Sequence, residues 1–227
     1  MNYRNYFKRF GDKSFNEFPF NDYDATMLAI MSYIKWESLL SDFENDFIDF
    51  KTLIDQDIDK LSKETLDPHH HAKITKLIIN SARYKDVKAK YLVNKVDFNK
   101  KYTFCAITFE IPDGHDLVCY RGTDITVLAW EENFSQSLDI VTPSQSDSVE
   151  YLTKVAPLIS HNFYVCGHSK GGNLAIYASA KAAPEIQDRI LRILSLDGTG
   201  FYNESFFKEE SYLRIESKVM QIIPQSS

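Results

Sequence analysis

The sequence predicts an α/β protein in which helices cover a central sheet. Strand-length apolar runs alternate with helical segments beyond residue 145, a pattern typical of parallel strands joined by crossover helices. Three more strand-like runs precede them, whereas residues 1–86 show helical patterns. With 44% apolar and 14% aromatic residues, the 227-residue chain can bury a large core without disulfide or metal staples. We therefore expect a single domain over residues 1–227, with a helical segment at 1–86 and the sheet core at 87–227.

The helical segment is expected to contain at least three helices. One begins after Pro19-Phe20, because Asn21 or Asp22 can cap its first turn. A second is predicted within residues 37–67, where apolar residues recur at helical steps. Those residues are Phe43, Phe47, Phe50, Ile54, Ile58 and Leu61. A third helix is expected over residues 70–85.

The sheet core is expected to begin with antiparallel strands and to continue with crossovers. The turn Pro112-Asp113-Gly114 joins two of the strand-like runs. Pro184 marks the end of a helix, because proline cannot continue one. The predicted strands are 90–96, 103–111, 116–120, 163–166, 190–196 and 218–223, and the predicted helices are 148–160 and 171–182.

Composition excludes several classes of protein. A formal charge of −6 does not favour binding to nucleic acid. No apolar run approaches the ~18–20 residues that a membrane span needs. Three cysteines without CxxC spacing predict free thiols and a cytoplasmic location. The run His69-His70-His71 is expected to be exposed at a helix entry rather than to bind a metal, and no cofactor is implied. The sequence does not indicate an oligomeric state.

The segment from Phe163 to Ala175 carries the chemistry. It places Gly167-His168-Ser169-Lys170-Gly171 between a short apolar strand and an alanine-rich helix. On such a tight turn a serine hydroxyl is pushed out above the sheet, and the flanking residues approach so closely that both must be glycine. The backbone N–H of Lys170 would donate to an oxyanion, and the helix N-terminus favours negative charge. The alternative is a glycine-rich turn in which Ser169 only caps the helix.

A second segment, taken together with the turn at Ser169, forms a pattern typical of a known protein family. A strand ends in Tyr120-Arg121-Gly122-Thr123, and Trp130 and Asn133 follow. Together with Gly167-His168-Ser169-Lys170-Gly171-Gly172, these residues resemble the class III lipase branch of the α/β-hydrolases. Within that branch the chain is similar to a little-characterised group of bacterial lipase-like proteins. That similarity extends to Pro19-Phe20-Asn21-x-x-Asp24 and to Leu196-Asp197-Gly198-x-Gly200-Phe201.

The resemblance implies a fold and residue roles. The fold would be α/β-hydrolase-like, with a mostly parallel central sheet and helices on both faces. Ser169 would be the nucleophile, and Thr123 and Lys170 would donate to the oxyanion. Residues 125–137 would occupy the position of a lipase lid, although a helix packed on the core explains their apolar character equally well.

The catalytic base is missing from this pattern. In the α/β-hydrolase order a histidine follows the nucleophile, but all six histidines here precede Ser169. Asp197 is the candidate acid, or it organises the Gly198–Gly200 turn. His168 is expected to pack against a neighbouring strand. The family's last strand and histidine are absent, so the chain is either truncated or a natural form that has lost catalysis.

Two functions are therefore predicted. The first is a lipase-like serine hydrolase that cleaves a small-molecule or lipid carboxylic ester through an acyl-serine intermediate. Without a base, this 227-residue chain would be weakly active or inactive. The second is a non-catalytic binding or regulatory module built on the same fold.

Overall fold

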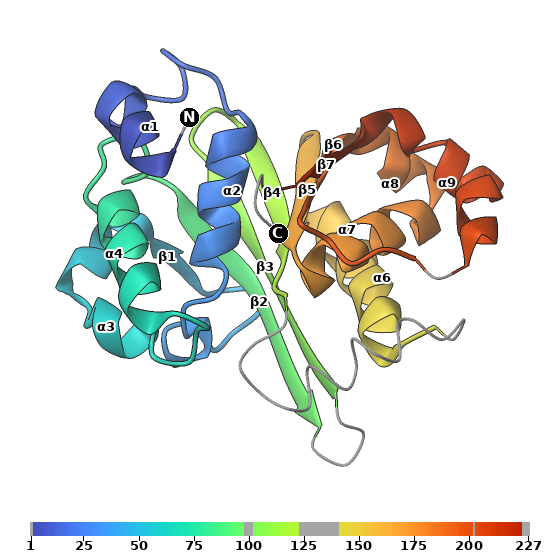
Figure 1. Ribbon diagram of the computed structural model, residues 1–227, viewed down its shortest axis with the longest axis horizontal. Helices are drawn as coiled ribbons and strands as arrows, with labels where there is room; N and C mark the ends of the chain where they lie inside the picture. Colours follow the sequence, from blue (N-terminus) through green and yellow to red (C-terminus); the bar gives the residue numbers. More distant parts are fainter. Residues whose placement is uncertain (1, 98–101, 123–140, 202, 224–227) are drawn as a thin grey trace.

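A computed structural model of the protein describes residues 2–97, 102–122, 141–201 and 203–223. Within these residues, seven strands form one sheet in the order β1-β2-β3-β4-β5-β6-β7 (Figure 1). Their bounds are Phe47–Asp49 (β1), Lys88–Asp97 (β2), Tyr102–Ile111 (β3), His115–Tyr120 (β4), Phe163–His168 (β5), Ile190–Leu196 (β6) and Val219–Ile222 (β7). β1 to β4 pair antiparallel and β4 to β7 pair parallel. The prediction of a mostly parallel sheet therefore holds only for the C-terminal half, because the strands from β1 to β4 pair antiparallel. A short turn rather than a crossover helix joins β3 to β4.

Helices cover both faces of the sheet (Figure 1). On one side lie α1 (Tyr3–Phe10), α2 (Asp22–Met31), α3 (Ile58–Leu61) and α4 (Pro68–Ile79). On the other lie α6 (Pro143–Val155), α7 (Lys170–Lys181), α8 (Pro184–Arg189) and α9 (Glu210–Leu213). Among the described residues, no helix is both long and apolar enough to cross a membrane.

The two helical layers bury two separate cores, one on each face of the sheet. Side chains alternate along a strand, so β4 sends Leu117 and Cys119 to the core under α2 and α4. Val118 and Tyr120, on the opposite face of β4, join the core under α6 and α7. From Leu117 to Tyr120, β4 is therefore apolar on both faces, as expected for a strand covered on both sides.

The predicted helix within residues 37–67 is wrong. The segment instead contains β1, which pairs with β2 at the sheet edge, and short helical turns at Trp36–Ser38, Phe50–Asp55 and α3. The Phe50 amide donates to the Val87 carbonyl at 2.9 Å, so the backbone is bound to the sheet rather than to itself. Phe47 and Ile54 are each 55% exposed, and the apolar residues do not share one buried face.

Some of the other predicted elements have different bounds, and some observed helices were not predicted. α4 begins at Pro68 and ends at Ile79, earlier than the predicted residue 85. Pro184 does more than end α7, because it is the first residue of α8. The turn before β4 is confirmed: Gly114 has φ 88° and its amide donates to the Ile111 carbonyl at 3.1 Å. α1, α8 and α9 were not predicted.

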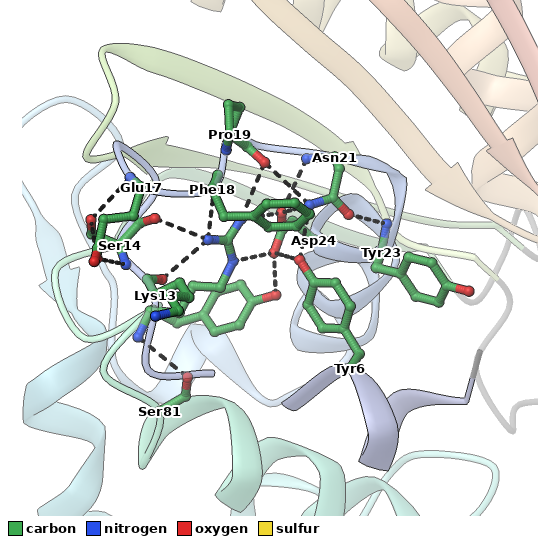
Figure 2. Close-up of polar contacts among 12 residues, drawn as sticks. Tyr6, Lys13, Ser14, Glu17, Phe18, Pro19, Asn21, Tyr23, Asp24 and Ser81 are labelled. Carbon is green, nitrogen blue, oxygen red and sulfur yellow. Dashed lines mark hydrogen bonds and ion pairs between the residues drawn. The ribbon is translucent and has the colours of Figure 1, made fainter. Parts of the chain in front are cut away.

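A buried ion pair fixes the start of α2. Asn21 caps the helix, and its backbone and side-chain nitrogens donate to Asp24 at 3.0 and 2.7 Å. Asp24 is fully buried and also receives two hydrogen bonds from Arg83, at 2.8 and 2.6 Å, and one each from Tyr6 and Tyr84. Figure 2 shows Tyr6 and Asn21 directed at the Asp24 carboxylate. The Asn21-x-x-Asp24 pattern therefore has a structural role, because it caps α2 and holds the buried ion pair with Arg83.

Candidate functional site

Ser169 occupies a sharp turn between β5 and α7. Its backbone has φ 55° and ψ −127°, a conformation that costs a non-glycine residue free energy. The residue is half-buried, and its side chain makes no capping hydrogen bond to the first turn of α7. The alternative in which Ser169 serves only as a helix cap is therefore not supported. Strain held at a serine without a capping role indicates a functional constraint.

The glycines around Ser169 are required by close backbone contacts. A Cβ on Gly167 would lie 2.1 Å from the carbonyl oxygen of Gly171. A Cβ on Gly171 would lie 2.1 Å from the carbonyl oxygen of Tyr120, the last residue of β4. Real Cβ atoms essentially never approach so closely, so both positions require glycine. The expected contact between the two flanking residues explains Gly167, whereas at Gly171 the clash is with the end of β4. The same contacts press the turn against the end of β4.

The residues that follow β4 lie next to Ser169. A Cβ placed on Gly122 would be 3.2 Å from the Ser169 Cβ and 2.3 Å from the His168 carbonyl oxygen. The Arg121-Gly122 step is thus part of the same site. Thr123, predicted as an oxyanion donor, lies outside the described residues, as do Trp130, Asn133 and the predicted lid at 125–137.

Lys170 is the first residue of α7, where an amide N–H has no acceptor within its own helix. This position is the one that an oxyanion donor needs. The Lys170 side chain turns inward and is buried, and its ammonium donates to the Thr103 carbonyl at 2.7 Å. That contact attaches the start of α7 to the start of β3, which the sequence did not suggest.

Tyr33 is a site residue that the sequence analysis missed. It follows α2, and its hydroxyl accepts a hydrogen bond from the Gly122 amide at 3.1 Å. The same hydroxyl lies 2.8 Å from Nδ1 of His168. His168 therefore does more than pack against a neighbouring strand, as was predicted, because it is hydrogen-bonded to the N-terminal segment. No motif marks Tyr33, so only the fold could reveal it.

Burial lowers the pKa of the His168 imidazole, and the negative charge of Asp197 opposes this shift. His168 is half-buried at the end of β5 and pairs with Leu196 at the end of β6. The imidazole is therefore mostly neutral at pH 7, although it directly precedes the nucleophile candidate.

Asp197 lies at the end of β6, one strand from Ser169. It is exposed, and its backbone has a left-handed φ of 47°. The turn after it is held by Asn173 of α7, whose side chain donates to the carbonyls of Thr199 and Gly200 at 3.3 and 3.1 Å. Asn173 is buried and was not predicted as a site residue. It fixes the Asp197 turn relative to the helix that follows Ser169.

Two of the remaining histidines lie away from Ser169. His115 and His161 are at the opposite end of the sheet, where Asp116 pairs with Phe163. There His161 Nε2 lies 2.8 Å from the buried Asp116 carboxylate. This Asp–His pair has the composition of a catalytic dyad but the wrong position for Ser169.

The histidine run on α4 is only partly exposed. His69 and His70 are exposed as predicted, but His71 is half-buried and its Nε2 lies 2.8 Å from the Ile30 carbonyl. Burial lowers the pKa of His71. Among the residues that the structure describes, no group of three or more His, Cys, Asp or Glu side chains could hold a metal ion.

These features define a mixed α/β protein with a strained serine at the carboxyl ends of parallel strands, the edge where such folds bind ligands. Residues 78–227 match the model of the Mbeg1-like family, and the chain belongs to this lipase-like family, whose function is unknown. No curated protein matches the chain.

Proposed function

We propose that the protein is a serine hydrolase of carboxylic esters. Ser169 Oγ attacks the ester carbonyl carbon and gives up its proton. The C–O bond to the alcohol then breaks, and the leaving alkoxide takes up that proton and departs as the alcohol. Water then hydrolyses the acyl-serine to a carboxylic acid and restores the hydroxyl. The Lys170 and Thr123 backbone N–H groups would hold the oxyanion. The substrate class is a small-molecule or lipid ester, and no cofactor is needed.

The backbone of Ser169 carries the proposal. A positive φ at a serine is uncommon, and here it coincides with glycines whose replacement would place atoms 2.1 Å apart. A structural turn would place glycine at the strained position and avoid this cost. Serine at that position is explained if its hydroxyl is the reactive group.

The proton acceptor limits the expected rate. No histidine follows Ser169 in the 227 residues, and His168 is hydrogen-bonded to Tyr33. Asp197 is our candidate acid, placed at the strand end beside the nucleophile. Without the base, oxyanion stabilisation and substrate binding leave a residual acceleration of roughly 10³–10⁴ over water. We expect slow hydrolysis by this chain.

The alternative is a binding module that retains the fold without turnover. It is favoured by the positions of His115 and His161, which are at the far end of the sheet. For either function we propose a cytoplasmic location, which is supported by the free thiols of the three cysteines.

A fluorophosphonate probe tests the proposal directly. We expect a covalent adduct on Ser169, identified by peptide mass spectrometry, and slow hydrolysis of p-nitrophenyl butyrate. Ser169→Ala should abolish both, whereas replacement of an exposed serine in Ser160→Ala should change neither. No adduct on Ser169 after prolonged exposure would reject the hydrolase and favour the binding module. Fast turnover would instead contradict our view of the missing base.

A further inference from the structure

An apolar cavity of about 300 Å³ lies between α2, α4 and the carboxyl ends of β5 and β6. Ala29, Ile30, Ile74 and Leu196 provide apolar walls, and Leu66 lies at its rim with 64% of its surface exposed. Its volume is at the lower end of the range of about 300–1,000 Å³ that is common for ligand pockets. A cavity of this size suits one unbranched hydrocarbon chain better than a two-chain lipid.

The cavity adjoins the proposed nucleophile through two residues. His168 lines it and directly precedes Ser169 in the chain. Tyr33 lines it as well, and its hydroxyl lies 2.3 Å from the point where a Gly122 Cβ would stand. The Ser169 Cβ lies 3.2 Å from that same point. The nucleophile and the wall of the cavity are thus separated by little more than one side chain.

The charges around the cavity suit an apolar occupant. Burial lowers the pKa of His71 and of His168, so both imidazoles are mostly uncharged at neutral pH. The one carboxylate in the lining belongs to Asp67, whose side chain is engaged as the N-cap of α4 and accepts from the His70 amide at 3.0 Å. The Thr26 and Thr65 hydroxyls in the lining donate to backbone carbonyls of their own segments. An alkyl chain therefore meets mainly methyl, methylene and ring surfaces.

We infer that this cavity binds the acyl chain of a medium-chain ester, with the ester carbonyl held at Ser169. The inference rests on the proposed function, whose substrate it narrows. Short acyl groups would leave apolar wall exposed to water, and each methylene that enters the cavity adds buried apolar surface. The chain length that fills the cavity sets the preferred substrate.

Binding can be measured without catalysis. The experiment uses the 227-residue Ser169→Ala protein and a dansyl-labelled undecanoate, displaced by the saturated fatty acids from butanoate to tetradecanoate. We expect each added methylene to strengthen binding about fourfold until the cavity is full, with no further gain beyond that length. A probe that does not bind, or a series without chain-length dependence, would overturn the inference.

Two variants test whether the fatty-acid chain binds in this cavity. Ile30→Trp fills the cavity while keeping the Ile30 carbonyl that His71 contacts, and Leu66→Glu puts a charge at its rim. Each should weaken binding of decanoate at least tenfold, whereas Leu213→Glu, at a 53% exposed leucine on α9, should leave it unchanged. Urea midpoints confirm that each variant is folded. Equal affinity in all three proteins would reject this cavity as the site.

The outcome separates this inference from the proposed function. Fluorophosphonate labelling of the native protein at Ser169, without chain-length dependence in the Ser169→Ala protein, would reject the cavity and keep the hydrolase. Chain-length-dependent binding without labelling would reject the hydrolase and leave a site for fatty-acid chains.

Discussion

Replacing Asp24 with asparagine should destabilise the protein strongly. The carboxylate is fully buried and accepts from Arg83, Tyr6, Tyr84 and Asn21, at distances of 2.6 to 3.0 Å. Asp24→Asn removes the negative charge and turns one accepting oxygen into a donor that faces other donors. The Arg83 guanidinium is then left buried without a counter-charge, which costs about 3–5 kcal/mol. The free energy of unfolding should fall by that amount.

The assay is urea unfolding followed by tryptophan fluorescence. With a slope of about 1–3 kcal/mol per molar urea, the midpoint should fall by roughly 1–5 M. Glu64→Gln removes an exposed ion pair with Lys35 and should change stability by less than about 1 kcal/mol. If Asp24→Asn does not fold, Tyr84→Phe, which deletes one hydrogen bond to the carboxylate, should cost about 1.5–3 kcal/mol. A shift no larger than that of Glu64→Gln would refute the reasoning.

Two further predictions concern the site. Gly167→Ala should cost at least about 3 kcal/mol in urea unfolding, because its Cβ would meet the Gly171 carbonyl, whereas Gly200→Ala meets nothing within 4 Å and should be neutral. Equal midpoints for the two variants would contradict this account. The folded-state pKa values of His71 and His168 are lowered from 6.5, so the unfolded chain binds more protons and stability should fall as pH drops below about that value. This loss should be smaller in the His71→Asn, His168→Asn double variant, and an unchanged pH dependence would reject burial as its cause.

Local sequence was enough to predict the sharp turn at Ser169. The need for glycine at 167 reflects a contact within a few residues of chain, because a Cβ there would lie 2.1 Å from the Gly171 carbonyl oxygen. The crossover half of the sheet was also predicted, and β6 has the predicted bounds, because apolar periodicity and short loops are local signals. The Mbeg1-like match, over residues 78–227, covers all of this half.

Where local sequence patterns predicted the wrong element, contacts between residues far apart in the chain determined the structure. Helical spacing between residues 37 and 67 was overridden by pairing of Phe47–Asp49 with β2, because hydrogen bonds to a sheet edge depend on a partner about 40 residues away.

Tyr33 illustrates the same limit at the site. It meets Gly122 and His168 only after the helices of the N-terminal segment have packed on the sheet. A tyrosine's role in such a contact depends on which backbone groups face it, and that is a property of the assembled layers. The sequence alone determined which serine is under backbone strain, whereas tertiary packing decided which side chains surround it and where a cavity remains beside it.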